Sequence, residues 1–353
     1  MYNSNLKVKF MSRPGERVWR HQLNSSYPVV NNCTFTFDID EREYDWLVVY
    51  DDLPPSNKER RSMRQEKLAC PPEKTILVTS EPSSIKSYFS EFTDQFGFVL
   101  TSQPEWALPH KNRIFSQPAL QWFYGVGSKN TIDFEGLHES NESCKDRLIS
   151  VVGSSKKEKH TLHALRYQFI KALTDSLPNI DIYGRGFTEM DDKAEAIQPY
   201  MFHIAVENHY SEHHWTEKLA DAFLGEAVPL YVGCPNIKQY FPEDSIIILD
   251  ISNPEEAIKT ISSLTAKEYF RRRPAVLEAK RKILHEYNLF SVIEKIVNSA
   301  NTKTNNDNET RILKSRRSMI KRSLRSSVKH LYQKIRLRII HRYKDSNLLK
   351  LLN

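Results

Sequence analysis

The sequence predicts an α/β protein made of two Rossmann-like, doubly wound domains followed by a basic amphipathic helical tail. Apolar runs of strand length alternate with helical patterns through most of the chain, which is typical of parallel βαβ units. The 353 residues can bury two sizeable cores, and a hydrophobic content of 39% is that of a soluble globular protein. No run approaches the ~18 apolar residues that a membrane-spanning helix needs.

The first predicted domain covers residues 1–145. Its expected strands are the apolar runs Leu6–Phe10, Tyr44–Tyr50, Lys74–Thr79 and Phe98–Thr101. Charged residues 57–69 favour a solvated helix, and a second helix is expected after Pro82. The polar stretch 138–146 is expected to link the two domains.

The second predicted domain covers residues 146–300. It is expected to open with a strand and a Gly-Ser-Ser loop, and to continue with a long amphipathic helix. The expected elements are the strands Arg147–Val152, Asn179–Tyr183 and Ser245–Leu249, the helix Glu158–Leu177, and helices between Pro254 and Asn298.

Residues 201–233 form a strand–loop–helix–strand pattern inside this domain. The apolar run Met201–Val206 predicts a strand, and Thr216 is a plausible N-cap for the helix that follows a His-rich loop. Leu219, Ala222 and Phe223 make an apolar helix face, and 227–232 returns as a buried strand. Where such strands meet a helix N-terminus, α/β folds bind phosphorylated ligands.

This segment resembles the donor-binding signature of family 10 glycosyltransferases, the α-1,3/4-fucosyltransferases, in their bacterial type. The matching strings occur in order and with matching spacing: Val206-Glu207-Asn208, Thr216-Glu217-Lys218, Ala227-Val228-Pro229 and Gly233-Cys234-Pro235. The resemblance implies a GT-B fold with two domains facing a cleft. It also implies transfer, with inversion, of L-fucose or a related deoxysugar from a GDP-sugar to a glycan acceptor such as lipopolysaccharide O-antigen. The alternatives are a non-catalytic nucleotide-sugar-binding module and a nucleic-acid-associated protein.

A nucleotide-sugar site must neutralise the charge that builds on the departing nucleotide. Lys218, in the first helical turn, is placed to meet the pyrophosphate, and Arg166 matches the family's phosphate-binding arginine. The alternatives are a solvated lysine and an arginine in an ion pair along its helix.

By resemblance, Glu217 accepts hydrogen bonds from ribose or sugar hydroxyls and Asn208 orients the loop or the donor. Glu207, His214 and Thr216 complete the expected donor-binding set. The plain alternatives are that Glu217 only complements the helix dipole, worth ~0.3–1 kcal/mol, and that Glu207 only ends a strand.

The general base is expected in the first domain. Glu81 follows an apolar strand, and the resembled family has an acidic residue there, usually as Glu-Ser-Pro; this chain reads Glu81-Pro82-Ser83. Asp51 and Asp52, at another strand end, are the competing acids, either as a metal-binding pair or as a solvated strand terminus.

A metal site is not expected. His209, His213 and His214 have only Glu212 near them, and a donor-contacting loop is the preferred interpretation. In the resembled family, Tyr often stands at the position of His214 and Ser at that of His209. The four cysteines, Cys33, Cys70, Cys144 and Cys234, form no C-x-x-C pair, and the N-terminus lacks the apolar region of a signal peptide. A reduced cytoplasm is therefore expected.

The tail, residues 301–353, carries the basic charge. Residues 311–344 hold 13 Lys/Arg and no acid. The rest of the chain therefore holds 38 of the 51 basic residues and all 44 acidic residues, which gives it a net charge of −6. Apolar residues recur at three- and four-residue steps: Ile320, Leu324, Val328, Leu331, Tyr332, Ile335, Ile339 and Tyr343. Because nucleic acid offers such a stripe no apolar phase, an anionic membrane surface is the expected partner. The protein is thus expected to be peripheral on the inner face of the plasma membrane.

Overall fold

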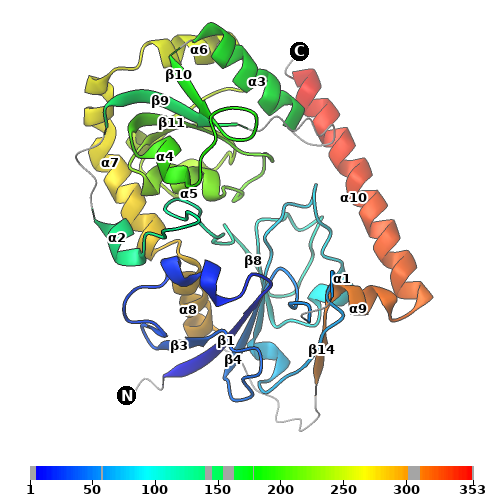
Figure 1. Ribbon diagram of the computed structural model, residues 1–353. Helices are drawn as coiled ribbons and strands as arrows, with labels where there is room; N and C mark the ends of the chain where they lie inside the picture. The colour runs from blue at the N-terminus through cyan, green and yellow to red at the C-terminus, as the bar shows by residue number, and fades with distance from the viewer. Residues whose placement is uncertain are drawn as a thin grey trace. The chain divides into compact units, whose positions relative to one another are not determined.

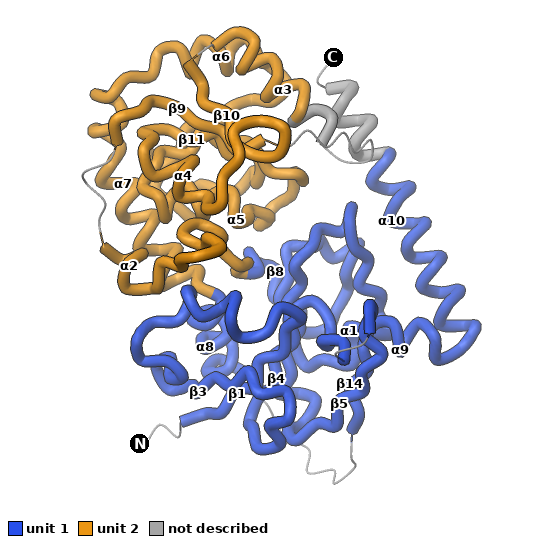
Figure 2. Tube along the Cα trace, viewed as in Figure 1, with its two compact units in different colours: residues 1–118, 289–344 blue, residues 119–288, 345–353 orange. Residues whose placement is uncertain are grey.

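The computed structural model describes residues 5–56, 59–139, 145–153, 163–177, 179–300 and 311–351, without the side chains of 163–166 and 343–351. The chain divides into two compact units (Figure 2). Unit 1 comprises residues 1–118 and 289–344, and unit 2 comprises 119–288 and 345–353.

Unit 1 is built on a seven-stranded sheet of order β2-β3-β1-β4-β6-β7-β8. Its strands are β1 (Leu6–Ser12), β2 (Val29–Val30), β3 (Cys33–Thr36), β4 (Trp46–Tyr50), β6 (Thr75–Val78), β7 (Phe98–Thr101) and β8 (Arg113–Phe115). Only the β2–β3 pair is antiparallel among these strands, so the carboxyl ends of β1, β4 and β6 meet at one edge. In β1 and β4, which lie side by side, Val8 stands opposite Trp46 (Figure 1).

Helices of unit 1 come mostly from the C-terminal part of the chain. They are α1 (Ser90–Thr93), α8 (Leu289–Ser299), α9 (Arg316–Lys321) and α10 (Leu324–Leu351), the last of which belongs to unit 1 up to residue 344. Phe290 of α8 packs its ring against Phe10 and Phe35 of the sheet, with ring centroids 5.5 and 5.1 Å away. This aromatic contact holds α8 in unit 1.

Unit 2 has a five-stranded, all-parallel sheet of order β10-β9-β11-β12-β13 (Figure 1). Its strands are β9 (Arg147–Val152), β10 (Ile180–Tyr183), β11 (Tyr200–Val206), β12 (Val228–Val232) and β13 (Ile247–Ile248). Its helices are α2 (Phe134–His138), α3 (His163–Ser176), α4 (Lys193–Ile197), α5 (Glu217–Leu224), α6 (Pro254–Ser262) and α7 (Ala266–His285). Strands β11 and β12 are almost wholly buried, as parallel strands covered on both faces should be.

The two mainly parallel sheets confirm the predicted α/β class with two Rossmann-like domains. The GT-B arrangement, with a cleft between the domains, stays a prediction. The domain boundaries differ from the predicted 1–145 and 146–300. Unit 2 begins at residue 119 because the aromatic side chains of Trp122, Tyr124 and Phe134 are buried in its core.

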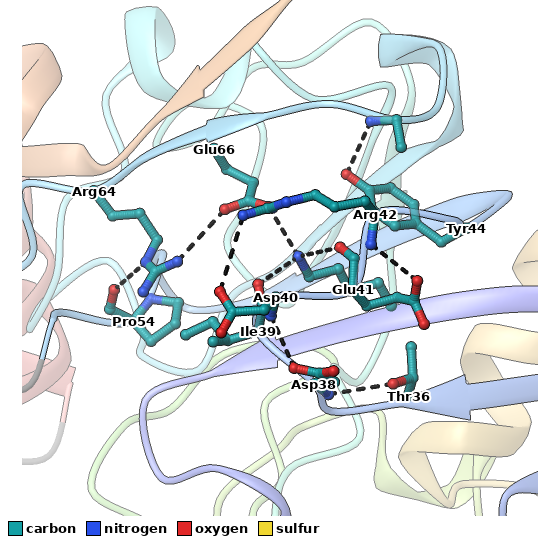
Figure 3. A network of polar contacts seen from close by, with 12 residues as sticks. Thr36, Asp38, Ile39, Asp40, Glu41, Arg42, Tyr44, Pro54, Arg64 and Glu66 are labelled. Carbon is teal, nitrogen blue, oxygen red and sulfur yellow. Dashed lines mark hydrogen bonds and ion pairs between the residues drawn. The ribbon is translucent and has the colours of Figure 1, made fainter.

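Residues 57–69 were expected to form a helix, and this prediction is wrong. The structure has a strand there, β5 (Gln65–Lys67), whose central residue Glu66 is 2% exposed. Glu66 accepts a hydrogen bond of 2.8 Å from the Lys9 Nζ of β1, which is itself fully buried (Figure 3). Arg42 Nη1 lies 2.9 Å from the same carboxylate and Arg64 Nη1 lies 3.5 Å from it. The buried ion pair between Glu66 and Lys9 therefore outweighs the local helical pattern of residues 57–69.

The tail is not a separate appendage up to residue 344, contrary to the predicted 301–353 region. Strand β14 (Ile312–Lys314) pairs with β5 in antiparallel fashion, and Leu313 stands opposite Glu66. Leu313 and Met319 are buried in the core of unit 1. The apolar side chains at these two positions therefore serve the domain core.

Helix α10 nevertheless keeps an exposed apolar row. Its members are between 47% and 87% exposed: Leu324, Val328, Leu331, Tyr332, Ile335 and Ile339. Within the described residues, none of the helices combines the length and the apolar character required to span a membrane.

Replacing Glu66 tests the buried ion pair. Glu66→Ala should lower the free energy of unfolding by roughly 3–5 kcal/mol, because it leaves the Lys9 ammonium buried without its counter-charge. Urea denaturation of the full chain would measure the change. The control is Glu243→Ala, which removes the exposed pair with Lys238 and should have little effect. Equal, small losses in both variants would contradict the structural importance of Glu66.

Candidate functional site

The carboxyl ends of the parallel strands in unit 2 form the edge where a site can be built. Gly153, Gly184, Glu207 and Gly233 directly follow β9, β10, β11 and β12. A Cβ on Gly184, whose φ is +112°, would stand 2.2 Å from the carbonyl oxygen of Gly153. The backbone at Gly184 therefore approaches that at Gly153 as closely as glycine alone permits.

Glu207 ties the end of β11 to the start of α5. Its carboxylate is 2% exposed and accepts two hydrogen bonds from Thr216: one of 2.8 Å from the backbone N–H and one of 2.6 Å from Oγ1. Lys218 Nζ lies 3.5 Å from the same group. Gly233 has no room for a side chain, since a Cβ there would lie 2.5 Å from Cγ of Glu207.

Helix α5 begins where the sequence predicts. Thr216 is its N-cap, and its Oγ1 accepts a hydrogen bond of 3.4 Å from the backbone N–H of Lys218. The apolar face of the helix, Leu219, Ala222 and Phe223, is fully buried, which confirms the predicted amphipathic pattern. Burial of this face and the Glu207 carboxylate together fix the first turn of the helix at the edge of the sheet.

Lys218 and Glu217 form an ion pair in that first turn. Lys218 Nζ donates to Glu217 Oε1 at 2.8 Å and to Thr216 Oγ1 at 3.1 Å, and both charged side chains keep about a fifth of their surface exposed. Burial opposes ionisation of Glu217, but the cations of Lys218 and Lys193 outweigh it and lower its pKa to about 2. Burial raises the pKa of Glu207, against the influence of Lys218 and Thr216.

Lys193 is a second cation near this turn, and the sequence analysis missed it. It opens α4, which Asp192 caps, and its Nζ lies 2.6 Å from the buried Asp221 Oδ2 of α5. Asp221 also accepts the backbone N–H groups of Phe123 and Tyr124 at 2.9 and 3.0 Å. A lysine in the first helical turn opposes the helix dipole, and this local mismatch is the signal that could have drawn attention to it.

The His-rich loop packs against the same region. His214 is buried, and burial, followed by the charge of Lys218, lowers its pKa to about 4. Its ring meets that of His209 edge to face at 5.5 Å. His213 has a φ of 59°, and its Nδ1 hydrogen-bonds to the Tyr240 hydroxyl. Within the described ranges, no group of three or more His, Cys, Asp or Glu side chains is arranged to hold a metal ion.

The structure thus brings five predicted donor-site residues together: Glu207, His214, Thr216, Glu217 and Lys218. Asn208 is half-buried directly beside them. Arg166 falls in the first turn of α3, and its side chain lies outside the described residues. The bonds of Glu207 identify it as the residue that positions Thr216 and Lys218, and its expected contact with the donor stays a prediction.

The candidate bases lie in unit 1. Glu81 is exposed, three residues beyond the end of β6, and its backbone carbonyl accepts a hydrogen bond of 2.8 Å from Gln103 Nε2. The Asp51 carboxylate is held by Lys86, Tyr88 and Ser80; burial opposes its ionisation, but Lys86 and these hydrogen bonds lower its pKa. Burial raises the pKa of Asp52. The structure therefore leaves Glu81 as the most accessible of the three acids.

Comparison with known proteins finds similarity in the central part of the chain. The model of the glycosyltransferase family 10 (fucosyltransferase) C-terminal domain matches residues 142–304. A fucosyltransferase-like protein of Arabidopsis thaliana is 35% identical over 106 residues, which cover 29% of this chain and 21% of that protein. Mouse 4-galactosyl-N-acetylglucosaminide 3-alpha-L-fucosyltransferase 9 is 31% identical over 126 residues, 34% of each chain. The matches thus span about a fifth to a third of these relatives.

Among solved structures, a crystal structure of an α1,3-fucosyltransferase with GDP is similar with a TM-score of 0.46 and 17% identity. The alignment covers 85% of this chain and 92% of that one. The family match encloses β9, the signature unit from β11 to β12, and all residues of the Glu207–Thr216–Lys218 cluster. Residues 142–304 are therefore similar to the C-terminal domain of glycosyltransferase family 10 (fucosyltransferase), and this match covers slightly less than half of the chain.

Proposed function

We propose that the protein is an inverting glycosyltransferase that moves L-fucose, or a related deoxysugar, from a GDP-sugar to a glycan acceptor such as lipopolysaccharide O-antigen. The observation that carries the proposal is the first turn of α5. In a family 10 domain, Thr216, Glu217 and Lys218 lie at the carboxyl edge of a parallel sheet, anchored by one buried carboxylate. The family match and the named relatives support fucosyl transfer. A Xenopus laevis relative that is 23% identical over 230 residues is named GDP-fucose protein O-fucosyltransferase 3, which supports GDP-fucose as the donor.

The donor's pyrophosphate would meet Lys218 and the N-terminus of α5. In the structure, Lys218 is already paired with Glu217. Donor binding would therefore replace or share this pair: the ammonium turns to the pyrophosphate, while the carboxylate becomes free to accept hydrogen bonds from ribose or sugar hydroxyls. Arg166 would supply a second cation, so charge on the leaving GDP can be neutralised without a metal ion.

The acceptor hydroxyl needs a base, and we assign this role to Glu81. Asp51 is a poorer candidate because Lys86, Tyr88 and Ser80 already occupy its oxygens. Asp52 accepts the backbone N–H groups of Leu53 and Arg316, each at 2.9 Å. Glu81 is the exposed acid of the three, and its carboxylate would take the proton as the hydroxyl oxygen attacks the anomeric carbon.

We also propose that the protein works at the inner face of the plasma membrane, bound through α10. The support is the exposed apolar row, Leu324 to Ile339, within a segment of 13 Lys/Arg and no acid. Such a helix can bury its apolar face in the interface while its cations meet anionic headgroups. Cys33, Cys70 and Cys234 are free thiols, in keeping with a reducing compartment.

Lys218→Ala tests the donor site. Loss of one charge-assisted contact, worth ~1.5–3 kcal/mol, should weaken GDP binding by roughly 10- to 100-fold while the protein stays folded. Titration calorimetry with GDP measures the change, with Lys171→Ala as the control because that lysine forms an exposed pair with Asp175 in α3. Unchanged GDP affinity in Lys218→Ala and in Arg166→Ala would overturn the assignment of the site.

Glu81→Gln tests the base. The amide keeps the shape of the side chain but takes no proton, so the transfer rate should fall by roughly 10²–10⁴ at unchanged GDP affinity. Initial rates with a fucosylatable acceptor and GDP-fucose measure this. Asp51→Asn and Asp52→Asn serve as comparisons; if one of them loses the rate and Glu81→Gln does not, the role belongs to that aspartate.

Substitutions on α10 test the membrane contact. Leu331→Gln combined with Ile335→Gln should reduce pelleting with vesicles that contain anionic lipid, and high salt should then release the remaining protein. The unaltered chain should be released only in part, because salt does not screen its apolar contact. The control is Phe270→Gln, an exposed apolar position on α7. Equal pelleting of all three proteins would refute the contact, and tight duplex binding without vesicle binding would favour the nucleic-acid alternative.

A further inference from the structure

A cavity of about 640 Å³ in unit 1 is lined by basic side chains from both ends of the chain. From the first 118 residues come Arg13, directly after β1, and Lys86, in the loop beyond β6. The tail contributes Arg316 and Arg317 of α9 and Lys334 of α10. Altogether five arginines and three lysines line the cavity, against two aspartates. It lies at the carboxyl edge of the sheet, where α/β folds bind ligands.

The two aspartates are already engaged and leave most of this positive charge uncompensated. Asp51 pairs with Lys86 and Tyr88, and Asp52 accepts backbone N–H groups, one of them from Arg316. Among the residues that the structure describes, Arg317, Lys321 and Lys334 have no ion-pair partner. A net positive cavity of this kind attracts and binds anions.

The pKa of His330 in α10 is lowered in part by the positive charges that line the cavity. His330 lines the cavity, and its ring packs on Phe89 at 4.9 Å. Burial lowers its pKa first, and the charges of Arg316 and Lys334 lower it further. Its buried Nδ1 has no hydrogen-bond partner within the described part of the chain.

We propose that this cavity is a subsite for a phosphate or pyrophosphate group of the acceptor, which makes the acceptor a phosphorylated glycan. The inference rests on the proposed glycosyl transfer and names the class of acceptor. Arginine forks match phosphate oxygens two at a time, and the volume accommodates a sugar phosphate or diphosphate. The tail thereby becomes part of the acceptor site, since it supplies four of the eight cations: Arg316, Arg317 and Lys321 of α9, and Lys334 of α10.

The residues of α10 that line the cavity and the exposed apolar residues proposed to contact a membrane lie on different sides of the helix. His330 and Lys334 are one turn apart on the side that lines the cavity. The buried Leu337 and His341 continue the same face, and His341 hydrogen-bonds to Ser83 at 3.0 Å. At 3.6 residues per turn, the exposed row from Leu324 to Ile339 falls on the other side of the helix. A lipid headgroup bound to that row would not reach the cavity by the same contact.

The first experiment measures the anion site without requiring catalysis. The full chain, saturated with GDP so that the donor site is filled, is titrated with inorganic pyrophosphate in a calorimeter. Arg317→Gln and Lys334→Gln should each weaken pyrophosphate binding by about tenfold while GDP affinity stays unchanged. Arg338→Gln is the matched control, because it removes the same charge from an exposed position on α10 outside the cavity.

The second experiment measures the acceptor. With GDP-fucose, the two cavity variants should raise KM for a phosphorylated glycan about tenfold and leave kcat and the KM for the unphosphorylated glycan unchanged. Vesicle pelleting should be unaffected. If pyrophosphate binding behaves as expected but no acceptor is fucosylated, the anion site stands and the proposed function fails.

Three results would overturn the inference. One is an absence of pyrophosphate binding to the GDP-saturated protein. Another is equal pyrophosphate affinity in Arg317→Gln, Lys334→Gln and Arg338→Gln. The third is a loss of vesicle binding in the cavity variants with no change in discrimination between the two glycans, which would assign the cavity to lipid headgroups instead.

Discussion

The buried carboxylate of Glu207 is the interaction on which the candidate site depends. It stands at the end of the central strand β11 and uses both oxygens to hold Thr216, the N-cap of α5. A buried carboxylate is costly unless its lone pairs are satisfied, so the loop between strand and helix must close on this residue. Gly233 on the neighbouring strand leaves the space in which the carboxylate lies. The hydrogen bonds between Glu207 and Thr216 thereby position Glu217 and Lys218 at the carboxyl edge of the sheet.

The sequence predicts those elements whose structure depends on residues close to one another along the chain. Strands β1, β4, β6, β9 and β11 are short apolar runs, and the N-cap at Thr216 follows from its chemistry and its spacing to the apolar face of α5. The proximity of Glu207 and Lys218 could be predicted for the same reason, since they lie eleven residues apart within one strand–loop–helix unit, and their role in donor binding stays a proposal.

Features that depend on distant partners could not be predicted. Glu66 sits in a stretch with a helical pattern, but Lys9 of β1 and Leu313 of β14 hold it in a strand. Lys193 is held near this region by its ion pair with Asp221 on another helix. The sequence shows that the positive charge of the tail lies in residues 311–344. Only the fold shows that α10 has one face that lines the cavity and another that carries an exposed apolar row.

A division of tasks between the units follows from these observations. Unit 2 holds most of the segment that matches the family 10 model, and the anchored start of its helix α5 suits the proposed nucleotide-sugar donor. Unit 1 provides an exposed acid, Glu81, and a basic cavity at the carboxyl edge of its own sheet. The tail completes that cavity through α9 and α10, and the pairing of β14 with β5 makes the tail part of the domain. A charged acceptor near an anionic membrane would use both sides of α10.

Glycosyl transfer itself is most directly tested by incubating the full chain with GDP-fucose and a panel of glycans, neutral and phosphorylated, and following GDP release together with the product by NMR. The expected result is acceptor-dependent release of GDP in equal amount to a fucosylated glycan, with the anomeric configuration inverted relative to the donor. Tight binding of GDP-fucose with neither transfer nor hydrolysis would contradict it and would identify a non-catalytic nucleotide-sugar-binding module.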